Sequence, residues 1–507
     1  MKKWQIYVFP ILIALIFSIR ELLINRSLWI DEAFSFFQSQ MPLVSWIAMY
    51  PLLFLLSIIF LALAGYLFCR NGIGRKLTAF GLILFGLAFM FLSKMNPKDV
   101  HPPFYYLLLK GWISIVWITP YALRSLSLVF FIASVVAIVY YCRKYYCDRV
   151  ALIAGTLFAF SSTFVHFGTE IRMYSMLVFF TMLSFVWFRK LVENQVSGKD
   201  MILYYLFTIV LPFLHYLGLL FIAFEIGIFL WFRKSLKQAV KTFLPIVMAC
   251  IPLAIFFVLQ SSRIINIGLG FPAPSIMSWI SSISFALNYP QYLAVAEGVV
   301  YTIWFFIALL VLFLMALYVV KRKDRWCSAE YILVIIPQLL GIIFMGLLLN
   351  KYHPRFFLLF LWLIPVLLAQ AINFVIEKKK YFGYALLILI LASMSLAYAC
   401  SYSSHEIQDV IRDIPKGSII VHDSISTFLP FEYYLRGTFY ENYIFTNLSA
   451  SQLRAVGSDA IDKKQIIKIL PKEKFYYVQA EIPIENMRFI KDYNGIELWE
   501  SENNGTA

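Results

Sequence analysis

Two adjacent carboxylates, Asp31 and Glu32, follow the first long apolar segment of the chain almost at once, in the run SLWIDEAFSFF. Ionised groups lose hydration near hydrocarbon, so an acidic pair at a membrane boundary is a functional-site hypothesis by default. The pair predicts a general base, or a metal-binding carboxylate, that activates an acceptor hydroxyl. The alternative is a helix N-cap, because Asp favours the start of a helix and acids suit its dipole.

A second candidate lies in the run NPKDVHPPFYYLLLKGW, where Asp99 precedes His101 by two residues. A carboxylate and an imidazole at this spacing could hold a metal or a phosphate-bound substrate. The one cofactor suggested here is a divalent metal, with Asp31, Asp99 and His101 as candidate ligands. The alternative is turn chemistry, in which Pro102 and Pro103 fix the start of a helix and the aromatic residues form an interfacial belt.

The run HFGTEIRMYSM contains Glu170, Arg172 and Tyr174. The acid and the base are two residues apart, so they do not face each other along a helix and each needs a different partner. An arginine at the mouth of a span suits a phosphate, which its planar fork can bind through two hydrogen bonds. A local ion pair or an interfacial snorkel is the alternative.

The run NKYHPRFF places Lys351, Tyr352, His353 and Arg355 before a late apolar stretch. Two cations and an imidazole beside an apolar helix predict a site for a phosphate whose lipid tail runs into the bilayer. The alternative is a basic loop without a ligand. Arg124, at the start of another apolar stretch, is a further candidate for substrate binding, and a snorkelling anchor is its alternative.

The elements that must position these residues are membrane helices. The chain has 507 residues, of which 61% are hydrophobic and 14% are charged, whereas soluble domains are nearer half apolar and about a quarter charged. With a mean hydropathy of +0.78, this composition predicts a polytopic membrane protein. The net charge of +15 does not indicate nucleic acid as a partner, because the basic residues form short clusters between apolar runs.

The apolar runs set the predicted number of spans. A span needs about 20 apolar residues, which predicts about 13 spans in this chain. They lie near 4–24, 44–69, 77–93, 123–142, 151–168, 173–190, 202–217, 218–232, 242–260, 298–320, 330–350, 356–376 and 381–400.

Basic clusters predict the orientation in the membrane. With these spans the clusters all fall on one side, which the positive-inside rule assigns to the cytoplasm. We therefore expect an integral plasma-membrane protein with a cytoplasmic N-terminus. The alternation holds only if the apolar segment FYYLLLKGWISIVWI does not cross, so it is predicted to lie in the outer interface or to dip back out. The clusters contain Lys2, Lys3, Arg70, Arg75, Lys76, Arg143, Lys144, Arg149, Arg189, Lys190, Arg233, Lys234, Lys237, Lys321, Arg322, Lys323, Arg325, Lys378, Lys379 and Lys380.

The predicted architecture is a polytopic α-helical membrane domain, residues 1–400, followed by a small α/β domain, residues 401–507. Within the first, 44–93 form a transmembrane hairpin and 94–122 an outer juxtamembrane segment. After residue 401 the composition is mixed and polar, with the strand-like runs GSIIVHD, KFYYVQAE and NGIELWE. This domain follows an odd number of spans, so it is expected outside the cytoplasm.

The order of these elements resembles a known superfamily. An acidic pair after the first span is followed by DVHPPFYYLLL, by YALRSLSLVF, by an E-x-R-M-Y element and by KYHPRFF. This order is similar to that of GT-C membrane glycosyltransferases, and the branch that it resembles most is the protein O-mannosyltransferase and aminoarabinose-transferase group. The chain departs from the group in one respect, because the hairpin 44–93 separates the acidic pair from the H-P-P element.

The resemblance implies roles for individual residues. Asp31 would be the catalytic base, assisted by Glu32. Arg124 matches the basic residue after the first-loop helices, and His101 matches the histidine of the D-x-H-P-P element.

Two later elements also match the group. Lys351 and Arg355 fall where the group binds the donor phosphate. Glu170 and Arg172 match an element whose role the resemblance does not define.

The resemblance also implies a reaction. Members of the group take a sugar from a polyprenyl-phosphate carrier and pass it to an acceptor outside the cytoplasm, which here could be a protein, a lipid or a glycan. Stabilisation of the leaving phosphate by fixed cations favours direct displacement, so inversion is expected.

Two other classes stay open. One is a flippase or transporter of lipid-linked sugars, which should carry polar residues deep inside its spans, whereas mid-span positions here are nearly all apolar. The other is a non-catalytic receptor or assembly protein built around the C-terminal domain.

Overall fold

The computed structural model describes residues 4–23, 26–40, 101–102, 104–266, 276–288, 299–349, 353–399, 406–436, 438, 440–445, 465–467, 471, 474–479, 487–492 and 496–501. The predicted hairpin 44–93 lies outside the described residues. So do three of the predicted site residues, Asp99, Lys351 and Tyr352.

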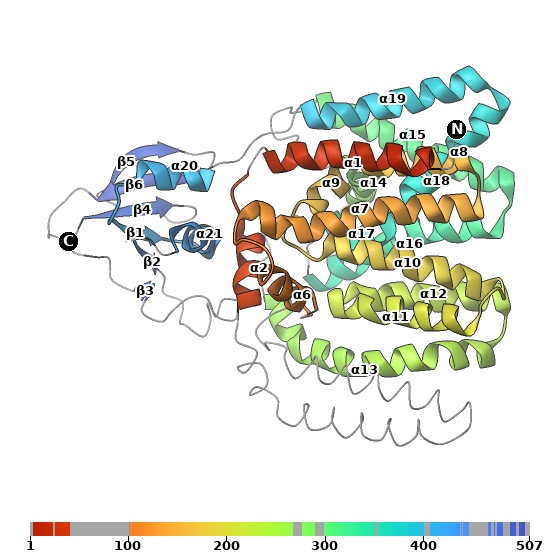
Figure 1. Cartoon of the computed structure of the whole chain (residues 1–507), viewed down its shortest axis with the longest axis horizontal. Helices are drawn as coiled ribbons and strands as arrows, with labels where there is room; N and C mark the ends of the chain where they lie inside the picture. The colour runs from red at the N-terminus through yellow and green to blue at the C-terminus, as the bar shows by residue number, and fades with distance from the viewer. Residues whose placement is uncertain are drawn as a thin grey trace.

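Most of the described chain is a bundle of apolar helices that lie side by side along the long axis of the molecule (Figure 1). In hydrocarbon each backbone polar group must be bonded internally, which a helix achieves within one segment. The helices are α1 (Gln5–Leu23), α7 (Pro120–Tyr145), α8 (Asp148–Phe160), α9 (Ser162–Gly168), α10 (Tyr174–Val192), α11 (Gly198–Leu214), α12 (Leu217–Arg233), α13 (Leu236–Asn266), α14 (Ile276–Leu287), α15 (Val299–Arg322), α16 (Arg325–Leu349), α17 (Leu358–Leu361), α18 (Leu363–Lys378) and α19 (Lys380–Ala399), with the 3-10 helix η2 (Pro354–Phe357).

Five of the described helices are long and apolar enough to cross a membrane, and there are up to seven candidates if each of two bent helix pairs is one span. One bend of 63° separates α8 from α9, and another of 52° separates η2 and α17 from α18. The first bend falls at Ser161, whose hydroxyl donates to the carbonyl of Ala286 in α14 at 2.9 Å. The total of about 13 spans stays a prediction.

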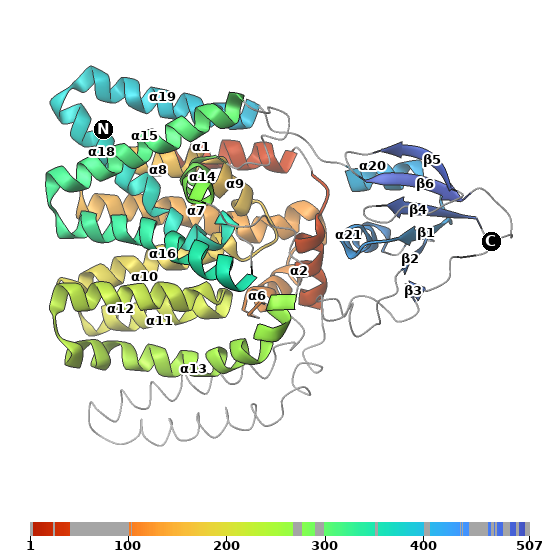
Figure 2. The same cartoon turned by 180° about the vertical axis from the view of Figure 1, so that it is seen from behind.

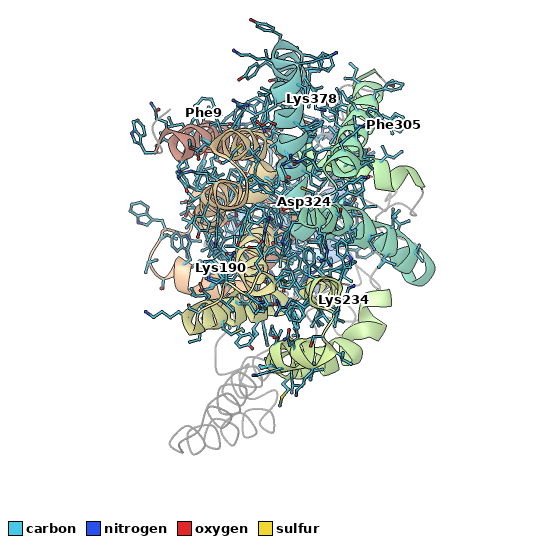
Figure 3. All side chains as sticks on the ribbon, turned by 90° about the vertical axis from the view of Figure 1, so that its right-hand side faces the viewer. Phe9, Lys190, Lys234, Phe305, Asp324 and Lys378 are labelled. Atoms are coloured by element: carbon cyan, nitrogen blue, oxygen red, sulfur yellow. The ribbon has the colours of Figure 1, made fainter. Side chains whose placement is uncertain are left out.

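The end of the bundle that is remote from the C-terminal domain carries basic residues. Figure 3 looks onto this end and shows Lys190, Lys234 and Lys378 there. They belong to three of the clusters from which the orientation was predicted, so the clusters that they represent share one end of the bundle.

Two short helices, α2 (Ile30–Gln40) and α6 (Phe104–Ile113), lie at the opposite end, beside the C-terminal domain (Figures 1 and 2). A helix of 10 residues is about 15 Å long, half the thickness of the hydrocarbon core. α6 therefore does not cross a membrane, in agreement with the prediction for its segment.

In its described residues, the C-terminal domain is a sheet with two helices, α20 (Glu406–Asp413) and α21 (Ile425–Leu435). Its strands follow the order β3-β2-β1-β4-β6-β5. β1 pairs in parallel with β2 and β4, with Ile419 opposite Glu441 and Phe475, while β6 runs antiparallel to β4 and β5. The strands are β1 (Ile419–His422), β2 (Glu441–Phe445), β3 (Ile466–Ile467), β4 (Phe475–Gln479), β5 (Met487–Asp492) and β6 (Glu497–Ser501).

The three predicted strand runs correspond to β1, β4 and β6, so the small α/β domain is confirmed. β1 and β4 are the central strands, and their apolar residues Ile420, Val421 and Tyr477 are buried. β5 was not predicted, because its residues face solvent along most of its length and carry no apolar alternation.

Two buried glutamates lie within the helices: Glu225 near the middle of α12, an exception to the nearly all apolar mid-span positions, and Glu330 near the start of α16. Glu225 in α12 accepts hydrogen bonds from Ser184 at 2.9 Å and from Tyr204 at 2.8 Å. Glu330 in α16 accepts from Tyr141, Tyr146 and Gln370. Both carboxyl groups are bonded to protein groups on neighbouring helices, so they tie helices together.

Candidate active site

The site is built around the first turn of α2, which begins directly after the extended segment 26–29. The amides of Glu32 and Ala33 both donate to the carbonyl of Trp29, at 3.0 Å each, and this starts the helix. Asp31 and Glu32 are neighbours in sequence, so they project from α2 about 100° apart. The two carboxylates therefore meet different surroundings.

Asp31 faces two arginines that come from distant parts of the chain. Its Oδ2 atom lies 3.3 Å from Nη1 of Arg355 and 3.7 Å from Nη2 of Arg172. Arg172 precedes α10, and Arg355 belongs to η2. The Asp31 side chain keeps 24% of its surface exposed, so a molecule in solvent can reach this carboxylate.

Arg172 is held from several sides. Its Nη2 atom is 3.4 Å from Nε2 of His101, and its Nη1 atom donates to Oγ of Ser35 at 3.4 Å. Its backbone carbonyl accepts a hydrogen bond from Ser127 of α7 at 3.2 Å. The structure therefore brings Asp31, His101, Arg172 and Arg355 together, and their use as one substrate site stays a prediction.

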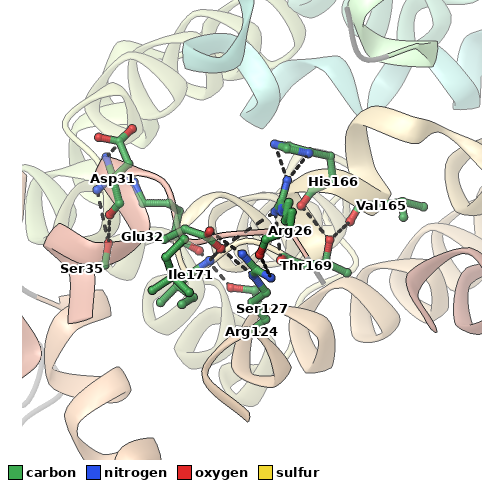
Figure 4. Close-up of polar contacts among 12 residues, drawn as sticks. Arg26, Asp31, Glu32, Ser35, Arg124, Ser127, Val165, His166, Thr169 and Ile171 are labelled. Carbon is green, nitrogen blue, oxygen red and sulfur yellow. Dashed lines mark hydrogen bonds and ion pairs between the residues drawn. The ribbon is translucent and has the colours of Figure 1, made fainter. Parts of the chain in front are cut away.

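Glu32 is enclosed by a separate group of donors (Figure 4). Arg124 donates from Nε and Nη2 to its two oxygens, at 2.8 and 2.7 Å, and the amide of Ile171 donates at 3.1 Å. The side chain of Glu32 is fully buried, and that of Arg124 is 1% exposed. The hydrogen bonds of Glu32 and Arg124 are thus made within the protein, and they join α2 to α7 and to the loop before α10.

Arg26 is a site residue that the sequence reading missed. Its guanidinium lies 2.7 Å from Nδ1 of His166 and 3.9 Å from Glu32, and it donates to the carbonyl of Thr169 at 3.1 Å (Figure 4). It thereby anchors the segment before α2 to α9. A cation only five residues before the acidic pair was the available signal.

Glu170 and Tyr174 are buried beside these groups, and their side-chain oxygen atoms form no hydrogen bond with the described residues. The spacing predicted a separate partner for Glu170 and for Arg172, and among the described residues only Arg172 has one, Asp31. Burial, and next the charge of Glu32, raise the pKa of Glu170 to about 7.

His353 has a local role in the structure. Its Nδ1 atom accepts a hydrogen bond from the amide of Arg355 at 3.1 Å and caps η2. Burial, followed by the charge of Arg355, lowers the pKa of His353 to about 3, so its imidazole is neutral at physiological pH. The neighbouring predicted residues Lys351 and Tyr352 lie outside the described chain.

The described residues do not form a metal site. They contain no group of three or more His, Cys, Asp or Glu side chains that could hold a metal ion. Of the predicted ligands, Asp31 and His101 both face the guanidinium of Arg172, which already supplies a positive charge between them. Asp99 falls outside the described residues, so the metal stays a prediction and enters no step below.

Electrostatics keep the Asp31 carboxylate ionised. Burial by itself would raise its pKa, but Arg172 and Arg355 outweigh this effect and hold the pKa of Asp31 below its ordinary value. The site thus contains a carboxylate whose counter-charges are two arginines. The two arginines of such an arrangement can bind a phosphate. The carboxylate can accept a proton once the arginines pair with that anion in its place.

The bundle of apolar helices with a small C-terminal sheet domain has a GT-C-like fold. Among the similar solved structures is ArnT from Cupriavidus metallidurans. Its apo structure matches with a TM-score of 0.51 and 9% identity over 87% of this chain and 97% of that one. Its complex with undecaprenyl phosphate matches with a TM-score of 0.50 over the same shares at 9% identity.

One further similar structure has a lower score, and two other comparisons found no match. The oligosaccharyltransferase AglB from Archaeoglobus fulgidus, in complex with an inhibitory peptide and a dolichol-phosphate, has a TM-score of 0.41 and 14% identity over 78% of this chain and 64% of that one. No protein-family model and no curated protein sequence matches the chain.

Proposed function

We propose that this protein is a membrane glycosyltransferase that transfers a sugar from a polyprenyl-phosphate donor to an acceptor on the extracytoplasmic side. The observation that carries the proposal is the group formed by Asp31, Arg172 and Arg355, with one partly exposed carboxylate between two arginines. The likeness of fold to ArnT, one of whose structures contains undecaprenyl phosphate, supports a lipid phosphate as the anion.

In the proposed reaction Asp31 is the general base. An acceptor hydroxyl attacks the anomeric carbon, and its proton passes to Asp31. The bond between the anomeric carbon and the phosphate oxygen breaks, and the polyprenyl phosphate leaves with the electron pair. Direct displacement inverts the anomeric centre, which the configuration of the product would test.

The two arginines give the base a means of activation. While they face Asp31 its pKa is low and it is a weak base. A donor phosphate would compete for Arg172 and Arg355, since an arginine fork pairs well with phosphate. Asp31 would then lose its counter-charges, and its pKa would rise as the substrate binds.

In this proposal Glu32 and Arg124 do not contact the substrate and instead keep α2 in position. Their atoms are saturated by each other and by neighbouring groups, so they hold the helix that carries Asp31. Glu170 and Tyr174 have unoccupied polar atoms beside the site, and we assign them to substrate contact together with His101.

The experiment uses the purified full-length protein with radiolabelled undecaprenyl-phosphate monosaccharides and native membranes as the source of acceptor. We expect transfer by the native protein and loss of transfer in Asp31→Asn at an unchanged level of folded protein. Asp148→Asn is the matched control, because Asp148 is an exposed acid at the start of α8, away from the site. Near-normal transfer by Asp31→Asn would refute the assignment of the base.

The same preparation tests the flippase alternative. Reconstituted protein that moves the labelled lipid between leaflets without forming a glycosylated product would favour a flippase. The two buried glutamates do not favour that class, because Glu225 and Glu330 are bonded to protein groups on both oxygens.

A further inference from the structure

α2 has two faces with different partners. Its apolar residues Ile30, Ala33, Phe34 and Phe37 follow the spacing i, i+3, i+4, i+7, which places them on one side of the helix. This side packs against Phe428, Leu429 and Ile444 of the C-terminal domain. Asp31 and Ser35 lie on another side, toward Arg172.

The contact is dense and comes mainly from α21, which lies beside α2 in Figures 1 and 2. Phe428 and Leu429 are buried there together with Ala33. One turn further along α2, the ring of Phe36 meets Tyr433 edge-on, with ring centroids 5.1 Å apart. Apolar side chains that are excluded from water on both partners make this a packed interface.

Polar contacts fix both ends of the interface. The hydroxyl of Tyr434 accepts a hydrogen bond from the amide of Leu28 at 2.9 Å, two residues before α2 begins, and another from Gln408 of α20 at 3.1 Å. At the other end, the guanidinium of Arg436 lies 4.3 Å above the ring of Phe36. Contacts at both ends restrict rotation and sliding of the short helix.

We propose that the C-terminal domain is a clamp for the catalytic helix: α21 holds α2 so that Asp31 stays at its working distance from the reacting atoms. Tyr434, Phe428 and Leu429 are positioning residues, and the domain acts on the chemical step. This inference rests on the proposed function for the role of Asp31, whereas the mechanical contact stands independently of it.

If α21 positions α2, loosening their contact should affect the rate of transfer and not the binding of the donor. Arg172 precedes α10 and Arg355 belongs to η2, so both cations of the donor site are carried by segments other than α2 and stay in place when α21 loosens. A displacement of about 1 Å in a catalytic group can lower a rate about 100-fold. Weakening the clamp should therefore lower kcat and leave the KM for the donor nearly unchanged.

The test uses two variants of the full chain with matched controls. Tyr434→Phe removes the acceptor for the Leu28 amide, and its control is Tyr440→Phe, which loses a hydroxyl bonded to Ile414 inside the same domain. Leu429→Ala opens the interface, and its control is Leu498→Ala, an equal truncation in the core of the domain.

Two measurements are made on each variant. The first is kcat and the donor KM per folded protein, with an undecaprenyl-phosphate monosaccharide as donor. The second is hydrogen exchange of the α2 amides, which does not depend on activity. We expect both interface variants to lose about 10- to 100-fold in kcat and to exchange faster in α2, and both controls to stay within about twofold, below the range expected for a displaced catalytic group.

Each outcome decides the inference. Unchanged kcat in both interface variants, or equal losses in Leu429→Ala and Leu498→Ala, would overturn it. If the native protein transfers no sugar but α2 exchange still rises in Tyr434→Phe and not in Tyr440→Phe, the clamp is supported and the proposed function fails.

Discussion

Replacement of Arg124 by methionine should reveal how much the Glu32–Arg124 pair contributes to stability. The guanidinium donates to both oxygens of Glu32, at 2.8 and 2.7 Å, and to the carbonyl of Arg26 at 3.1 Å. Removal of one partner from a buried ion pair costs about 3–5 kcal/mol, because the other charge is left uncompensated. Glu32 would keep its hydrogen bond from the amide of Ile171 and its contact with Arg26 at 3.9 Å. We therefore expect the free energy of unfolding to fall by about 3 kcal/mol, the lower end of this range.

The pH dependence follows from the direction of the pKa. Burial opposes the charge of Glu32, but Arg124 outweighs it and keeps the pKa of Glu32 below its ordinary value. A carboxyl group whose pKa is lower in the folded than in the unfolded protein stabilises the folded protein. This contribution is complete at pH values above the unfolded-state pKa, about 4.3, and is lost as the pH falls through the folded-state pKa. The difference between native protein and Arg124→Met should therefore shrink in acid.

The assay is denaturant unfolding in detergent across a double-mutant cycle with Glu32→Gln. The double variant should recover part of the loss, because no unpaired charge remains. Arg143→Met is the control, since its partner Asp148 is exposed and such surface pairs contribute at most about 1 kcal/mol. A coupling energy below about 0.5 kcal/mol for Glu32 and Arg124 would refute the reasoning.

Three further outcomes are expected. Glu170 has a folded pKa of about 7, so the stability of the native protein should decline from about pH 4.5 to pH 7, and Glu170→Gln should remove a decline of about 3 kcal/mol; parallel pH curves in unfolding experiments would contradict this. Glu330→Ala should lower the free energy of unfolding by about 1–3 kcal/mol, because three buried or half-buried donors lose their acceptor while Arg189 keeps its ion pair with Glu193; calorimetry that finds less than about 1 kcal/mol, the range of surface pairs, would exclude a stabilising cluster. Arg355→Gln should raise the donor KM about 10- to 100-fold, the value of one hydrogen bond to a charged group, and an unchanged KM in the transfer assay would remove Arg355 from the phosphate site.

Much of the fold was determined locally. Runs of apolar residues of the length of a bilayer can be satisfied only as helices, and the predicted spans outside 44–93 coincide with helices of the bundle. The central strands β1 and β4 were also predictable, because buried strands need apolar residues. α14 was not predicted, since at 12 residues it is shorter than a span.

The partners within the site were decided by tertiary structure alone. The sequence placed acids and bases at one end of the bundle, but Arg124 could equally have met a phosphate, whereas it binds Glu32 across 92 residues. Arg355 reaches Asp31 across 324 residues. Which buried charge meets which depends on the packing of the helices that carry them. For the same reason only the fold placed α21 against α2, although the apolar stripe of α2 was already present in its sequence.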